Sequence, residues 1–149
     1  MSLTVNQNKG KLTYQVKGFE EFRERATDVS LSRYEKAGFP DEYRAGKAPL
    51  IVADIVSKLS NLNGWNRRVL EIGPGCSDLP VAFVQHCGSR GHSVVLIDSA
   101  EMLNLLPDFP QATKIAGSFP DCAAQVEAVS QTFDAILAYS VIQYVFAEG

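Results

Sequence analysis

The chain has 149 residues, of which 46% are hydrophobic and 21% are charged, and its mean hydropathy is −0.04. A chain of this length and composition can bury a core, which excludes a disordered or low-complexity protein. The net charge of −3 gives no support to a nucleic-acid partner. No apolar run approaches the ~20 residues of a membrane-spanning helix, and the polar N-terminus is unlike a signal peptide. We therefore expect a cytoplasmic protein with no membrane partner.

The first third of the chain predicts a segment that precedes the main domain. Residues 1–10 are polar and are expected to form a frayed leader, and alternation over residues 12–16 predicts a short strand. A charged helix is expected from Phe19 to about Ala37, with Phe19, Phe22, Ala26 and Val29 on one face. We assign residues 1–47 to this leader and helical cap segment.

The main domain is assigned to residues 48–149 and begins with an amphipathic helix, with Pro49 in its first turn, that Asn63-Gly64 stops. Short apolar runs then alternate with helical segments. The runs cover residues 68–72, 92–98, 113–116 and 133–139, and the helices are expected over 77–87, 100–106 and 121–129. Strands that are apolar on both faces indicate a parallel sheet covered on both sides. The sequence thus predicts an α/β fold with a doubly wound, mostly parallel, Rossmann-like sheet, preceded by an N-terminal helical segment.

Three groups of residues follow the predicted strands, at the edge where open α/β sheets bind ligands. They are the turn Gly73-Pro74-Gly75, the carboxylate of Asp98 and the loop Gly117-Ser118-Phe119. Glycines permit a sharp turn and a close approach of a ligand, and an ionised carboxylate accepts the two hydrogen bonds of a ribose diol. Taken singly, each group has an ordinary explanation as a turn or a helix cap. Their common place after successive strands points to one binding crevice.

This arrangement resembles the class I S-adenosylmethionine-dependent methyltransferases over about residues 48–149. VLEIGPGCSD resembles the glycine-rich first motif of that family, VVLIDSAEML its second motif, KIAGSFPD its adenine-side loop and FDAILAYSVIQYV its fourth motif. Two positions depart from the pattern. Ser77 stands at the third glycine, and Ser118 stands where the family often has an acidic residue, for which Asp121 is an alternative.

The resemblance implies that the protein binds S-adenosylmethionine, transfers its methyl group to an acceptor and releases S-adenosylhomocysteine. The modest acidic charge and the compact size favour a small-molecule acceptor such as a sugar or a secondary metabolite. It implies that Glu71, Gly73 and Gly75 face the methionine part of the cofactor and that Asp98 binds both ribose hydroxyls. The other cofactor contacts that it implies are Ser77, Ser99, Met102, Gly117, Ser118, Phe119, Tyr139 and Ser140.

No catalytic residue is identified from the sequence. Tyr139, Gln143 and Tyr144 either contact an acceptor or pack against the next helix. A second group of residues precedes the amphipathic helix and either closes over the cofactor or forms a solvated basic face. This group is Tyr34, Tyr43, Arg44 and Lys47.

Three other kinds of function stay open. A nicotinamide-dinucleotide enzyme would use the same crevice, but Asp78 stands at the last position of the G-x-G-x-x-G fingerprint, where it repels the pyrophosphate. A non-catalytic S-adenosylmethionine-binding or interaction domain would keep the fold without an acceptor site, and a purely structural module ranks below it.

Cys76, Cys87 and Cys122 are an odd number with no Cys-x-x-Cys pair, and no histidine lies at metal-ligand spacing from them. Either one is a reactive thiol or ligand, or all three are small buried side chains in a reducing compartment. We favour the second interpretation and expect no metal site.

The chain reaches Gly149 soon after its fourth predicted strand, whereas members of the family usually have seven strands. We therefore expect a truncated domain that is incomplete at its C-terminus. Because an open apolar edge strand promotes association, this edge is expected to be protected by formation of a homodimer, by a rearranged C-terminus or by packing of the N-terminal segment.

Overall fold

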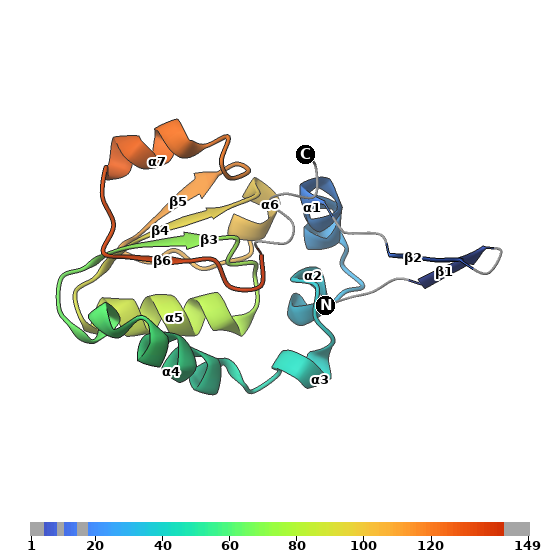
Figure 1. Ribbon diagram of the computed structural model, residues 1–149, viewed down its shortest axis with the longest axis horizontal. Helices are drawn as coiled ribbons and strands as arrows, with labels where there is room; N and C mark the ends of the chain where they lie inside the picture. Colours follow the sequence, from blue (N-terminus) through green and yellow to red (C-terminus); the bar gives the residue numbers. More distant parts are fainter. Residues whose placement is uncertain (1–4, 9–10, 15–17, 142–149) are drawn as a thin grey trace.

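The computed structural model describes residues 5–8, 11–14 and 18–141. Its centre is a four-stranded sheet in which every neighbouring pair of strands is parallel and the order is β5-β4-β3-β6. Helices lie on both faces of this sheet (Figure 1). The four strands are β3 (Arg68–Ile72), β4 (Ser93–Asp98), β5 (Ala112–Ala116) and β6 (Ala135–Leu137). The predicted α/β, Rossmann-like fold is confirmed.

Two layers of helices form the core against the sheet. On one face lie α4 (Ala48–Lys58) and α5 (Asp78–Ser89), and on the other lies α7 (Ala123–Val129) (Figure 1). Successive side chains of a strand point to opposite faces, so Val69 packs among the residues of α4 and α5, while Leu70 packs toward α7. This alternation within a fully buried strand explains why β3 reads as a continuous apolar run.

The helix that follows β3 begins where the sequence predicts it. Ser77 is the N-cap of α5, and its hydroxyl oxygen accepts a hydrogen bond from the backbone N–H of Leu79 at 3.4 Å. Asp78 adds a negative charge in the first turn, where its attraction to the positive end of the helix dipole stabilises the helix. The glycine turn is therefore held between a buried strand and a capped helix.

The helix expected from Phe19 to Ala37 is wrong as a single element, because the structure divides it into α1 (Phe19–Thr27) and α2 (Arg33–Lys36). The Asp28 carboxylate accepts hydrogen bonds from the backbone N–H and the hydroxyl of Ser30. Ser32 then starts α2 in a reciprocal capping box. These local bonds offer the backbone an alternative to a continuous helix.

Several other boundaries differ from the predicted ones. Part of the polar leader is ordered, because β1 (Val5–Asn8) pairs with β2 (Lys11–Tyr14) in an antiparallel hairpin. A short helix not expected from the sequence, α3 (Asp41–Arg44), follows Pro40. The helix α6 (Ala100–Leu103) ends before residue 106, because the chain tightens into turns ahead of Pro107, and β6 covers only residues 135–137.

The segment α1–α3, which we call the cap, lies against the carboxyl ends of the strands (Figure 1). An ion pair of 2.7 Å joins Arg23 of α1 to Glu101 of α6 (Ala100–Leu103). The hydroxyl of Tyr34 in α2 donates a hydrogen bond of 2.9 Å to the carboxylate of Asp78 in α5. The cap is thus tied to the first turns of both helices that follow β3 and β4.

β6 is an outermost strand of the sheet. It pairs with β3, and no second partner strand occurs among the described residues. The side chain of Ile136 in β6 is 56% exposed. Dimerisation through this edge stays a prediction. None of the helices in the described residues has the length and hydropathy that crossing a membrane requires.

Candidate ligand-binding site

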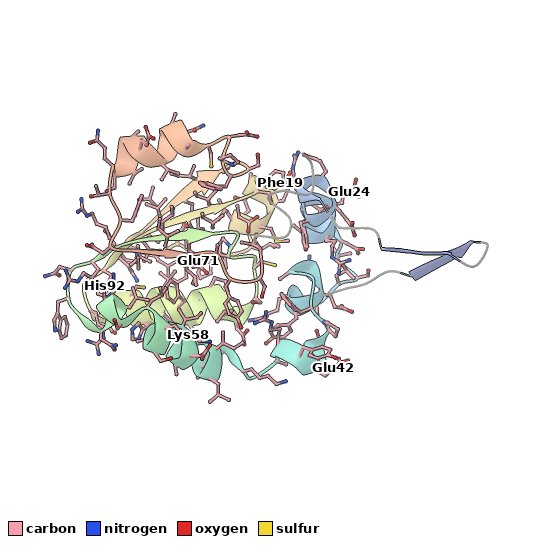
Figure 2. All side chains as sticks on the ribbon, in the orientation of Figure 1. Phe19, Glu24, Glu42, Lys58, Glu71 and His92 are labelled. Carbon is pink, nitrogen blue, oxygen red and sulfur yellow. The ribbon has the colours of Figure 1, made fainter. Side chains whose placement is uncertain are left out.

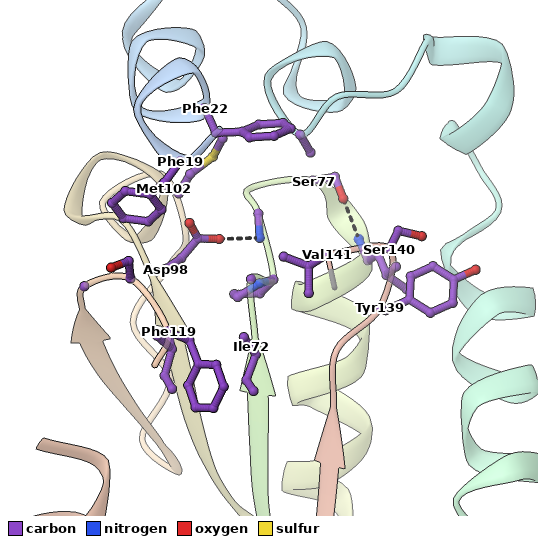
Figure 3. Close-up of a pocket in the computed structure, with 18 of the residues that line it drawn as sticks. Phe19, Phe22, Ile72, Ser77, Asp98, Met102, Phe119, Tyr139, Ser140 and Val141 are labelled. Atoms are coloured by element: carbon purple, nitrogen blue, oxygen red, sulfur yellow. Dashed lines mark hydrogen bonds between the residues drawn. The ribbon is translucent and has the colours of Figure 1, made fainter. Parts of the chain in front are cut away.

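The carboxyl ends of the strands open into a cavity of about 380 Å³ between the sheet and the cap (Figure 3). This volume lies within the range of small-molecule sites, roughly 300–1,000 Å³. The sheet side contributes the glycine turn after β3, the end of β4, the loop after β5 and the residues that follow β6. The cap contributes Phe19, Phe22, Ala37, Phe39 and Arg44. The edge predicted from the sequence is therefore hollow and is covered by aromatic side chains.

The turn after β3 requires glycine at two positions. Gly73 and Gly75 have φ values of +65° and +69°, a region that L side chains rarely adopt. A Cβ atom on Gly73 would lie 2.4 Å from Cγ2 of Val141, and one on Gly75 would lie 3.1 Å from Cβ of Ala37. The absence of side chains lets the turn pass between the residue that follows β6 and the cap.

Asp98 is fixed at the cavity by two backbone donors. Its Oδ2 accepts a hydrogen bond from the N–H of Gly75 at 2.9 Å (Figure 3), and its Oδ1 accepts one from the N–H of Ser99 at 2.7 Å. Burial raises the pKa of Asp98 to about 6, and the two backbone donors oppose this rise. Since each carboxylate oxygen accepts two hydrogen bonds, one site on each oxygen is left for a ligand.

Most of the site residues predicted from the sequence come together around this cavity. Those that line it are Gly73, Gly75, Ser77, Asp98, Met102, Gly117, Ser118, Phe119, Tyr139 and Ser140. The hydroxyl of Ser118 donates a hydrogen bond of 2.8 Å to the carboxylate of Asp121, which also lines the cavity. A carboxylate therefore does lie on the loop after β5, three residues after Ser118.

Glu71 and Ser99 do not line the cavity. Glu71 is 3% exposed and lies in the interior, while His92 lies at the end of the sheet away from the cap (Figure 2). Oε2 of Glu71 has no hydrogen-bond partner among the described residues, and burial raises the pKa of this carboxyl to about 8, so it holds its proton at neutral pH. Ser99 is buried as the N-cap of α6 and acts on the site through its backbone bond to Asp98. A contact between Glu71 and the methionine part stays a prediction.

The cap residues were the ones least accessible to sequence reasoning. Phe19 and Phe22 lie on the predicted apolar face of α1 and line the cavity, which the periodicity of the helix does not reveal. Val29, predicted on the same face, lies beyond the end of the helix and is 97% exposed. Arg44 lines the cavity, whereas Tyr34, Tyr43 and Lys47, which the sequence places in the same group before the amphipathic helix, do not. Tyr43 is 65% exposed. Gln143 and Tyr144 lie outside the described residues.

The cysteines are buried and unpaired with one another, as the second interpretation expects. Burial raises the pKa of Cys76 to about 11 and that of Cys87 to about 12, and it also raises the pKa of Cys122. Such thiols are unreactive at neutral pH. Within the described part of the chain, no group of three or more histidine, cysteine, aspartate or glutamate side chains is placed to hold a metal ion.

Comparisons with protein-family models, curated proteins and solved structures give no match to this chain. The functional conclusion therefore rests on the motifs in the sequence and on the geometry of the cavity.

Proposed function

We propose that the protein binds S-adenosylmethionine in this cavity and forms the cofactor-binding part of a methyltransferase that acts on a small molecule. The observation that carries the proposal is the placement of Asp98. Its carboxylate lies at the end of the second strand of the sheet, is oriented by the N–H groups of Gly75 and Ser99, and has one acceptor site left on each oxygen. Two adjacent acceptors of this kind match the diol of a ribose.

The other lining residues fit the remaining parts of the cofactor. Met102 and Phe119 lie on the Asp98 side of the glycine turn and offer apolar surfaces to a purine (Figure 3). Tyr139 and Ser140 lie on the other side of the turn, where the resemblance places the sulphonium. Between them lies the turn itself, where the absence of a Cβ on Gly73 leaves room for the side chain of Val141.

When bound, S-adenosylmethionine supplies an electrophilic methyl group together with its leaving group. The residues of this chain then need to bind the cofactor, orient it toward the acceptor and shield the reacting atoms from water. Asp98 fixes the ribose, and the rings of Phe19, Phe22 and Phe39 cover the cavity from the cap side and exclude water. Holding an acceptor atom about 3–3.5 Å from the methyl carbon is proximity catalysis. The proposal assigns no general base.

A second observation favours this proposal over a nicotinamide dinucleotide. The first turn of α5, where a diphosphate would bind, already contains the carboxylate of Asp78, which accepts a hydrogen bond from Tyr34. A diphosphate at that helix end would meet a negative charge and a covering side chain.

The proposal is tested by calorimetric titration with S-adenosylhomocysteine and, separately, with NAD. Asp98→Asn keeps the size of the side chain but replaces one acceptor by a donor. Since a hydrogen bond to a charged group contributes about 1.5–3 kcal/mol, we expect a loss of affinity of roughly 10- to 100-fold. The matched control is Asp134→Asn, because Asp134 accepts a backbone hydrogen bond from Arg68 at the amino end of β3 and does not line the cavity. Absence of S-adenosylhomocysteine binding, or binding that Asp98→Asn leaves unchanged, would refute the proposal.

A further inference from the structure

One end of the cavity is built around Arg44, the last residue of α3. Cζ of its guanidinium lies 3.9 Å from the centre of the Phe39 ring and 5.1 Å from that of the Tyr139 ring. Nη2 of Arg44 lies 3.4 Å from the hydroxyl oxygen of Ser140. A cationic side chain of the cap is thus held in place by a ring of the cap and by two residues that follow β6.

No carboxylate of the described residues forms an ion pair with Arg44, although its side chain is half-buried. The carboxylate of Asp41 at the start of the same helix accepts a hydrogen bond from the hydroxyl of Ser32. A guanidinium has five N–H donors, and its partial removal from water is offset only when an anion or other acceptors replace that water. The weak bond to Ser140 leaves most of these donors for a ligand.

The charges that line the cavity are separated along the edge of the sheet. Among the described lining residues, Arg44 is the one cation, and the anions are Asp98 and Asp121. Since β3 lies between β4 and β6, Asp98 and Tyr139 are on opposite sides of the glycine turn (Figure 3). A ligand that spans the cavity therefore meets hydrogen-bond acceptors on one side and a cation on the other.

We infer that Arg44 binds the carboxylate at the amino-acid end of the cofactor and so selects S-adenosylmethionine and S-adenosylhomocysteine over adenosine compounds that lack this group. The inference rests on the proposed function. A guanidinium donates two parallel hydrogen bonds to a carboxylate, and the rings of Phe39 and Tyr139 hold its plane in one orientation before the ligand arrives. Arg44 is a specificity residue in this assignment and takes no part in the methyl transfer.

The test compares ligands that differ only at this end. The affinities of the native chain and of Arg44→Met are measured by calorimetry for S-adenosylhomocysteine, for its decarboxylated analogue and for 5′-methylthioadenosine. Methionine keeps an unbranched apolar stem and removes the charge. We expect Arg44→Met to weaken S-adenosylhomocysteine binding by roughly 10- to 100-fold and to change the affinity for the other two compounds by less than about twofold. Arg44→Lys keeps the charge but cannot donate two parallel hydrogen bonds, so its affinity for S-adenosylhomocysteine should lie between those of the native chain and of Arg44→Met.

The matched control is Arg90→Met. Arg90 also lies over an aromatic ring, with Cζ 5.5 Å from the centre of the Trp65 ring, but it does not line the cavity. This variant should bind all three compounds as the native chain does. Retained binding of 5′-methylthioadenosine by Arg44→Met shows in the same experiment that the variant is folded.

Each outcome separates the two proposals. An equal loss of affinity for all three compounds, or no loss for any of them, overturns the assignment of Arg44 and leaves the proposed function standing. Equal affinity of the native chain for S-adenosylhomocysteine and 5′-methylthioadenosine also overturns the assignment of Arg44 without refuting the proposed function. If the native chain binds none of the three, the proposed function fails and the assignment of Arg44 fails with it.

Discussion

Alanine variants at Gly73 and Gly46 separate the cost of a steric clash in the cavity turn from the cost of a left-handed backbone. Their φ values are +65° and +72°, so alanine at either position adopts a left-handed backbone at a cost of about 1–2 kcal/mol. A Cβ on Gly46 meets no atom within 4 Å, whereas one on Gly73 would lie 2.4 Å from Cγ2 of Val141. The two alanine variants therefore differ in one contact.

The size of that difference follows from the distance. Carbon atoms pack at about 3.5–4.0 Å, so Val141 must move by more than ~1 Å to admit the new methyl group. Overpacking of this kind costs about 1–3 kcal/mol. We expect Gly73→Ala to lower the free energy of unfolding by about 2–5 kcal/mol and Gly46→Ala by only about 1–2 kcal/mol.

Urea denaturation followed by circular dichroism gives both values, and the slope of each curve shows whether the two variants unfold in the same way. A larger loss in Gly73→Ala, together with weaker binding of S-adenosylhomocysteine, is the expected result. If the two variants lose the same free energy, Val141 gives way without cost and the argument for a sterically required glycine is refuted.

Two further predictions concern buried titratable groups. Because burial raises the pKa of Glu71 from 4.5 to about 8, the folded state holds a proton that the unfolded state has released, and the free energy of unfolding should fall as the pH rises to about 8. Between about pH 6.5 and 8, above the pKa of Asp98, Glu71 lowers the free energy of unfolding by at most about 1.4 kcal/mol per pH unit. Glu71→Gln should remove this contribution, and denaturation curves of that variant with the native pH dependence would contradict the prediction. The three cysteine thiols, whose pKa values burial raises, should react with an aromatic disulfide at least about 100-fold more slowly in the native chain than in urea. Native rates close to those in urea would show that the thiols are accessible.

The sheet could be predicted from the sequence because its signal is local and strong. β3, β4 and β6 are short, mostly apolar and bounded by glycine, proline or polar residues, and in β4 the residues from Val94 to Ile97 are all buried. The same clarity extends to the loops after the strands, since Asp98 and Gly73 lie directly at strand ends. Residues at such positions meet at one edge of any parallel sheet.

The cap could not be predicted in the same way because its structure depends on contacts between distant parts of the chain. The four residues of α3 are too few to show a period, and Arg44 reaches the cavity only because Tyr139 and Ser140 leave β6 beside it. The break between α1 and α2 follows from competition between side chains and backbone at Asp28, which helical periodicity does not register. Glu71 was assigned by its place in a motif, whereas strand alternation turns it to the face that it shares with Val69.

The strand order has a consequence for how the cavity assembles during folding. β3, β4 and β5 are neighbours in the sheet and follow one another along the chain, but β6 crosses to the far side of β3, where Ala135 pairs with Val69. This pairing closes a longer loop than the pairing of Val69 with Val94, and long loops carry a larger entropic cost. We expect β6 to join a preformed three-stranded nucleus late. Tyr139, which helps to hold Arg44, follows that strand, so the site is completed in one of the last steps, and ligand binding reports on a chain that has finished folding.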